Sequence, residues 1–162
     1  MQRDVREAQT RLAVFIATVG YAGYFPVAPG TVGSAAGLVA YLIVWWTQSR
    51  VVEVALIASL FAVGVWAGTT AERYFGGIDP GPVIVDEVVG MLITLAFIPV
   101  GVSGAIVGFF LFRIFDIIKP FPAGRLEALH GGLGVMADDA MAAIYANLSL
   151  RGLMWLFPGW IA

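Results

Sequence analysis

The sequence contains no cysteine and few charged residues. Without cysteine, the chain of 162 residues has no disulfide, no thiolate metal ligand and no cysteine nucleophile. Charged residues make up 12% of the chain, against about 25% in soluble domains, while 60% of residues are hydrophobic. We therefore expect a membrane protein. The net charge of -2 gives no basic patch, so we expect no nucleic-acid partner.

Five apolar segments are long enough to form helices in or at a membrane, where a span needs about 20 residues. They cover residues 31–47, 51–71, 88–100, 102–118 and 138–157. A proline and two glycines at 99–104 predict a tight turn between the third and fourth helices. The predicted fold class is all-α: a compact polytopic bundle with about four to five membrane helices, at 31–157 of a single domain, 1–162.

The N-terminal segment, residues 1–30, is predicted to be interfacial. Arg3, Arg6 and Arg11 precede the apolar run LAVFIATV, but no clear small-residue cleavage pattern follows, which argues against a signal peptide. A basic helix lying on or dipping into the inner membrane surface fits these residues better. Whether residues 12–25 cross the membrane or lie on it stays open.

Three predicted helices carry Gly-x-x-x-Gly, a pattern that lets helix backbones approach closely in lipid. The pairs are Gly33 with Gly37, Gly64 with Gly68, and Gly104 with Gly108. Three pairs in separate segments favour a closely packed bundle.

Alternating crossings with the N-terminus inside give an asymmetric charge distribution. Seven basic residues fall on the inner side and two, Arg50 and Arg151, on the outer side, as expected for a cytoplasmic inner face. The same threading gathers nearly all of the loop and helix-end acids on the inner side, with only Glu53 outside. These inner acids are Asp79, Asp86, Glu87, Asp116, Asp138 and Asp139.

Two adjacent acid pairs, Asp86-Glu87 and Asp138-Asp139, stand at the starts of the third and fifth predicted helices. Acids favour helix N-termini, at about 0.3–1 kcal/mol each, so capping is one explanation. Two pairs and Asp116 at one depth would repel one another, however, unless a cation lies between them. Mg²⁺ takes carboxylate oxygens and serves phosphate chemistry, so we favour a metal site.

Candidate phosphate-binding residues lie nearby. On a helix, Arg113 and Lys119 fall on the same face as Asp116, where a guanidinium and an ammonium suit a phosphate monoester, although membrane anchoring explains them nearly as well. The segment APGTVGS leads into a helix whose first turn, at Thr31, offers backbone N–H groups to an anion. Secondary candidates are Asp79, the single histidine His130, and Ser34.

Exclusions restrict the phosphate chemistry that the sequence permits. A phosphatase with a histidine nucleophile and a second histidine is excluded by the single His130, and no Walker lysine follows APGTVGS. The sequence also lacks an Asp-x-Asp pair after a strand and the spaced aspartates of the CDP-alcohol transferases. Phosphate cleavage by this chain would depend on metal and carboxylates.

Four segments resemble the signature blocks of the phosphatidylglycerophosphatase A family: GYFPVAPGTVGS, VDEVVGML, FRIFDIIKPFP and HGGLGVMADDAMAAI. The resemblance covers about residues 20 to 148 and implies a bacterial inner-membrane enzyme. Such enzymes remove phosphate from phosphatidylglycerophosphate with Mg²⁺, on the cytoplasmic side. The resemblance also implies that the acidic positions of the family are occupied here by Asp86, Glu87, Asp116, Asp138 and Asp139. It implies that the residues contacting the phosphate are Thr31, Arg113 and Lys119.

The rival hypothesis is a non-enzymatic membrane transport component whose acids line an ion pathway. Acids along a pathway should occur at several depths, whereas here they gather at one face, which favours catalysis at the interface. The predicted partner is the phospholipid substrate in the membrane. One or two metal ions, attack by water or by a carboxylate, and a monomer or a homo-oligomer stay open.

Overall fold

The computed structural model describes residues 2–158, and the regular structure in this range is entirely helical, as predicted. The long helices are α1 (Gln2–Ala17), α2 (Pro29–Thr47), α3 (Arg50–Phe75), α5 (Val102–Ile118) and α7 (Gly132–Leu156). Shorter elements are η1 (Ala22–Tyr24), α4 (Val85–Leu95) and α6 (Ala123–Leu126).

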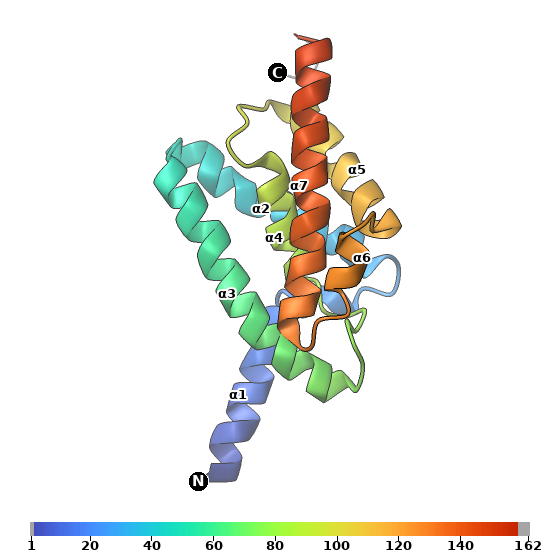
Figure 1. The fold of residues 1–162 in the computed structure, drawn as a ribbon. Helices are drawn as coiled ribbons and strands as arrows, with labels where there is room; N and C mark the ends of the chain where they lie inside the picture. Colours follow the sequence, from blue (N-terminus) through green and yellow to red (C-terminus); the bar gives the residue numbers. More distant parts are fainter. Residues whose placement is uncertain (1, 159–162) are drawn as a thin grey trace.

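The helices of the bundle alternate in direction (Figure 1). α2, α4 and α7 run one way, and α3 and α5 run the other way, so the starts of α2, α4 and α7 lie at the same end as the ends of α3 and α5. α4 packs between α2 and α7. α1 packs chiefly against α3 and extends away from the bundle at this same end.

Two helices, α2 and α3, are long and apolar enough to cross a membrane. Only 33% and 22% of their most apolar windows are buried inside the protein, which differs from the core helix of a soluble domain. Four to five membrane helices are not confirmed, because α4 has 11 residues and a length of about 16 Å, too short for a span.

Two predicted boundaries were wrong. The third helix is 85–95 rather than 88–100, because the chain leaves the helix at Ala96 and Phe97 takes a left-handed φ of 59°. The last helix begins at Gly132, not at residue 138, so Asp138 and Asp139 lie in its second turn. Glycine disfavours a helix interior, but a Cβ at Gly132 would lie 2.2 Å from the Val65 carbonyl oxygen, and this close packing against α3 stabilises the early start.

The glycine pairs do bring helices together, as predicted. A Cβ at Gly37 would lie 2.5 Å from Met91 Cβ on α4, and one at Gly68 would lie 3.1 Å from Gly132 Cα on α7. A Cβ at Gly108 would lie 2.8 Å from Leu95 Cδ2. These glycines therefore set the distances at which α2 meets α4, α3 meets α7, and α5 meets α4.

The segment 96–101, between α4 and α5, is non-helical backbone at one end of the bundle, and its residues 96, 98 and 100 are buried. Asn147 Nδ2 on α7 donates to the carbonyls of Ile93, Thr94 and Ala96 at 3.2, 3.0 and 3.0 Å. Arg151 donates through Nη2 to the Ala96 carbonyl at 3.0 Å and through Nε to Asn147 Oδ1 at 2.8 Å.

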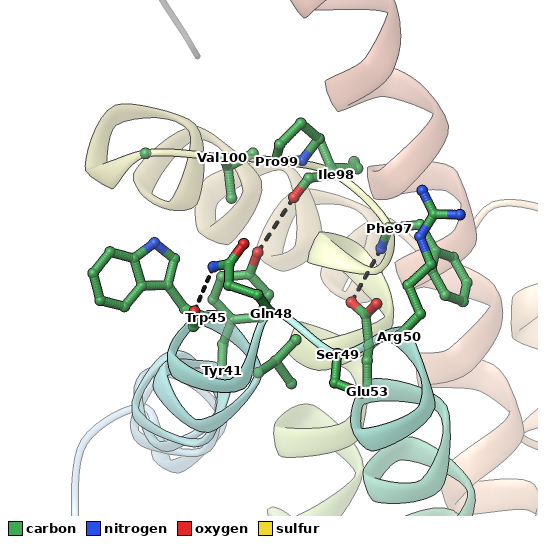
Figure 2. Close-up of a pocket in the computed structure, with 12 residues that line it drawn as sticks. Tyr41, Trp45, Gln48, Ser49, Arg50, Glu53, Phe97, Ile98, Pro99 and Val100 are labelled. Carbon is green, nitrogen blue, oxygen red and sulfur yellow. Dashed lines mark hydrogen bonds between the residues drawn. The ribbon is translucent and has the colours of Figure 1, made fainter.

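Two further side chains bond the same segment from other helices (Figure 2). Glu53 on α3, 5% exposed, accepts a hydrogen bond from the Phe97 N–H at 3.0 Å, and the Tyr41 hydroxyl on α2 donates to the Ile98 carbonyl at 3.3 Å. Backbone polar groups need such partners where water is absent. Side chains from three helices therefore hold the break after α4.

We predict that Asn147→Ala lowers the free energy of unfolding by about 1 kcal/mol, since the two amide hydrogens of Asn147 serve three carbonyls and each bond is worth roughly 0.6 kcal/mol. The measurement is thermal unfolding of the purified protein in a neutral detergent. Leu148→Ala is the matched control, because Leu148 is the next residue on α7 and is 60% exposed. Equal losses for the two variants would contradict the role given to Asn147.

Candidate active site

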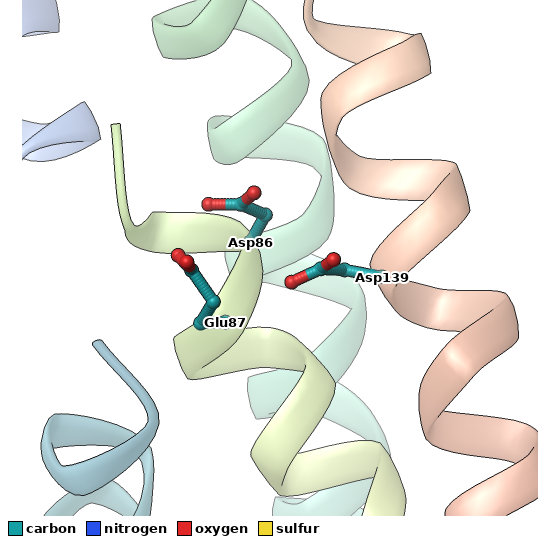
Figure 3. Close-up of side chains that lie close together, drawn as sticks. All are labelled: Asp86, Glu87 and Asp139. Atoms are coloured by element: carbon teal, nitrogen blue, oxygen red, sulfur yellow. The ribbon is translucent and has the colours of Figure 1, made fainter. Parts of the chain in front are cut away.

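Three acids from two helices form a compact cluster (Figure 3). Asp86 and Glu87 stand in the first turn of α4, and Asp139 stands in the second turn of α7. Each offers a carboxylate oxygen, and these three atoms lie within 4.8 Å of one another. Asp86 is 4% exposed and Asp139 is 3% exposed. Asp116 on α5 is also buried and lies close to Asp139.

Several carboxylate oxygens at this end of the bundle are buried without a hydrogen-bond partner. Among the described residues they are Asp86 Oδ1, Glu87 Oε2, Asp138 Oδ1 and Asp139 Oδ2. A buried polar atom without a partner is strongly disfavoured, and neighbouring carboxylates repel one another as well. Capping cannot explain Asp138 and Asp139, because they are not in the first turn of α7.

Hard divalent cations prefer carboxylate oxygens, so the set of oxygen donors fits Mg²⁺. Orphaned oxygens on Asp86, Glu87 and Asp139 converge from α4 and α7, and a cation there would satisfy them. The cluster therefore has the chemistry of a metal site.

Arg113 forms one side of the site. Its Nη1 lies 2.7 Å from Asp116 Oδ2 and 3.7 Å from Glu87 Oε1, and it donates to Ser34 Oγ at 3.5 Å. Ser34 in turn donates to the Gly30 carbonyl at 2.9 Å, which ties Arg113 to the first turns of α2. The Arg113 Nε is buried and has no partner.

Gly30 brings the start of α2 directly against this arginine. A Cβ at Gly30 would lie 2.3 Å from Glu87 Oε1 and 2.9 Å from both Nη atoms of Arg113. Ala28, the residue before the start of α2, has a left-handed φ of 48° and turns the chain into the helix. Thr31 is exposed and Ser34 is buried, so it is the secondary candidate Ser34 that contacts Arg113.

Lys119 belongs to a second group of charges. Its Nζ lies 2.6 Å from Asp138 Oδ2, 3.3 Å from Glu127 Oε2 and 3.9 Å from Asp79 Oδ2. Burial alone would lower the pKa of Lys119, but the hydrogen bond with Asp138 and the neighbouring acids raise it above the ordinary value. Lys119 is therefore a fixed positive charge.

The expectation that Arg113 and Lys119 share one face of a helix with Asp116 was wrong. α5 ends at Ile118, and Lys119 follows in a left-handed conformation with a φ of 45°. This turn carries the ammonium to Asp138 on α7, while Arg113 stays with Asp116. The two cations therefore serve different acids.

Asp79 lies in the loop before α4, beside Lys119. Burial raises the pKa of Asp79 to about 6, even though Lys119 acts in the opposite direction, and Asp138 and Glu127 add to the increase. Asp79 is thus a partly buried acid at the edge of the site.

One secondary candidate lies outside the cluster, and one contact residue was not predicted. His130 is exposed in the loop before α7. Glu127, which bonds Lys119, carried no signal in the sequence because it is a single acid in a loop.

A hollow lies at the opposite end of the bundle, and its lining residues do not suit this chemistry. It has a volume of about 470 Å³ and is lined by α2, α3 and the segment 97–101 (Figure 2). Its acid, Glu53, already bonds the Phe97 N–H. We therefore take the acid cluster as the candidate site.

Comparisons with known proteins agree with the motifs. The family described as Phosphatidylglycerophosphatase A matches residues 15–154. Two bacterial relatives carry the same name: one from Haemophilus influenzae is 37% identical, covering 88% of this chain and 89% of its own length. The other, from Escherichia coli, is 29% identical over 88% of this chain and 85% of its own length.

A third relative, from Bacteroides thetaiotaomicron, is 36% identical over 90% of this chain and 95% of its own length. Its name assigns it only provisionally as a phosphatidylinositol-3-phosphatase. No solved structure matches the chain. The family match covers the cluster of acids, Arg113 and Lys119, and the chain belongs to the phosphatidylglycerophosphatase A family of phosphoric monoester hydrolases.

Proposed function

We propose that the chain removes the terminal phosphate from phosphatidylglycerophosphate to give phosphatidylglycerol and inorganic phosphate, with Mg²⁺, at the cytoplasmic face of the bacterial inner membrane. The observation that carries the proposal is the group of buried carboxylate oxygens without partners beside Arg113. The Haemophilus and Escherichia relatives, named for this activity, support the choice of substrate.

Asp86, Glu87 and Asp139 are the residues that would hold Mg²⁺, with Asp116 and Asp138 beside them. The cation supplies positive charge that neutralises phosphate oxygens and activates the attacking group. An acidic cluster without a cation would repel a phosphate monoester, so the acids and the substrate both require this charge.

Arg113 and Lys119 contribute the chain's own positive charge. A guanidinium binds two phosphate oxygens through a planar fork, and Ser34 and Asp116 orient it. Lys119 acts as a point charge, which Asp138 holds in place. Hydrolysis breaks the bond between phosphorus and the lipid glycerol oxygen, which takes a proton, while water supplies the new oxygen on phosphorus.

The position of the site suits a lipid headgroup. Its residues come from the starts of α2, α4 and α7 and from the end of α5, and the excess of basic residues at this end of the bundle supports a cytoplasmic position. An ion pathway would need acids along the bundle, but at the opposite end the buried Glu53 holds a backbone N–H instead. This contrast favours the enzyme over the transport component.

We predict that the purified protein releases phosphate from phosphatidylglycerophosphate, that EDTA abolishes the release, and that added Mg²⁺ restores it. The measurement is inorganic phosphate released in mixed micelles. Full activity in EDTA would contradict the metal, and no release with Mg²⁺ present would contradict the substrate. A parallel assay with phosphatidylinositol 3-phosphate separates the two lipids named among the relatives.

We predict that Asp86→Asn, Glu87→Gln and Asp139→Asn each lower kcat/KM by more than tenfold, about 1.4 kcal/mol of barrier, because each removes a charge that the cation needs. Circular dichroism and yield in detergent check that the variants fold. Glu7→Gln is the control, since Glu7 forms an exposed pair with Arg11 on α1. If fewer than two of the three acids have this effect, the carboxylate site is wrong.

We predict that Gly30→Ala reduces activity by about tenfold or more with little change in melting temperature. The three atoms nearest to the new Cβ are the side-chain ends of Glu87 and Arg113, and moving them aside displaces both from the site. Gly152→Ala is the matched control, because nothing lies within 4 Å of that position on α7. A large loss of stability in Gly30→Ala would instead indicate a packing role.

We predict the orientation of the chain from single cysteines, which the cysteine-free sequence makes simple to interpret. Cysteine replacing Gly77, an open position beside the site, should react with an impermeant thiol reagent only after the membrane is opened. Cysteine replacing the exposed Thr47, at the other end of α2, should react in intact cells. The reverse pattern would place the site on the outside.

A further inference from the structure

A second hollow lies between α1 and the C-terminal half of α3, away from the acid cluster. It has a volume of about 460 Å³, and its walls include Arg6 and Thr10 of α1 and Trp66, Thr70, Arg73 and Tyr74 of α3. Its lining includes two arginines and no acid. The proposed reaction uses none of these residues.

The two arginines give the hollow an unbalanced positive charge. Both are exposed, and they come from different helices, Arg6 from α1 and Arg73 from the last turn of α3. The acids next to them in sequence are engaged elsewhere: Glu7 pairs with Arg11 at 2.6 Å, and Glu72 accepts from the Asp79 N–H at 3.3 Å. Two guanidinium groups facing one hollow favour an anion between them.

The other lining groups suit a phosphate in contact with lipid. Two of them can donate to phosphate oxygens, namely the Tyr74 hydroxyl and the Trp66 indole N–H, whereas the hydroxyls of Thr10 and Thr70 already donate to carbonyls of their own helices. Trp66 and Tyr74 are 43% and 60% exposed. Exposed aromatic rings of this kind prefer the depth of lipid headgroups.

The place of the hollow along α3 fits this depth. α3 is one of the two helices able to span a membrane, and Arg73 stands in its last turn, at the end of the bundle that holds the acids. A lipid with its phosphate at Arg73 could lay its chains along the apolar, exposed side of α3, where Val63 is exposed.

We propose that this hollow binds the headgroup phosphate of an anionic phospholipid and thereby fixes α1 against α3. Free phosphate offers the same oxygens but lacks acyl chains to lie on α3. The site is separate from the acid cluster, and the proposal does not depend on the reaction.

The test is binding of phosphatidylserine to the full chain in a neutral detergent, measured as the rise in melting temperature during a lipid titration. Phosphatidylserine is a diester without a terminal phosphate for the acid cluster. Arg6→Gln combined with Arg73→Gln should weaken the apparent affinity by more than about tenfold, because both guanidinium groups that would hold the phosphate are lost. Arg3→Gln with Arg125→Gln is the control, with the same change of charge at exposed positions that do not line the hollow.

Three results would overturn the proposal. The control pair could lose affinity as strongly as the test pair, which would indicate a general effect of charge. Phosphatidylcholine could bind as tightly as phosphatidylserine, or inorganic phosphate alone could give the full rise in melting temperature. If the double variant does not fold, the single variant Arg6→Gln, on the exposed end of α1, replaces it in the test. This substitution alone should still weaken binding severalfold.

Discussion

Repulsion between buried carboxylates is the constraint on which this structure depends. Five acids of α4, α5 and α7 meet at one end of an apolar bundle, and within residues 2–158 two cations pair with them. Arg113 pairs with Asp116 and Glu87 on one side, while Lys119 pairs with Asp138 on the other. Asp86 and Asp139 have no cationic partner among the described residues, and each keeps an oxygen without a hydrogen bond. A divalent cation would supply the positive charge that balances these acids.

The two ends of the bundle treat buried polar groups in opposite ways. Around the segment 96–101, Glu53, Tyr41, Asn147 and Arg151 each bond a backbone group, so polar side chains there complete the hydrogen bonding of the fold. Around the acid cluster, oxygens are left over. Satisfied polar groups indicate a structural role, and unsatisfied groups held close together indicate a place for something else to bind.

Local patterns in the sequence predicted the helices, the glycine contacts and the meeting of Asp86 and Glu87 with Asp139. Because successive helices alternate in direction, the end of one helix and the start of the next lie at the same end of the bundle. This alone was sufficient to predict that the acids meet. The pairing of Lys119 was not predictable, since it depends on where α5 ends and on the left-handed turn that follows. The role of Gly30 depends on an approach of α2 to α4 and α5 that no local pattern contains, and the early start of α7 depends on contacts with α3.

The hydrogen bonds of Asn147 also connect α4 and α7 at positions that lie equally far along the chain from the acids of each helix. α4 and α7 run in the same direction, Thr94 follows Asp86 by eight residues, and Asn147 follows Asp139 by the same number. The amide that bonds Thr94 therefore keeps the two helices in register about 12 Å from the acids. One residue inserted between Asp139 and Asn147 would turn the carboxylate by about 100° relative to the amide. In this protein the length of α7 between these two residues is thus part of the geometry of the acid cluster, although the intervening side chains take no part in it.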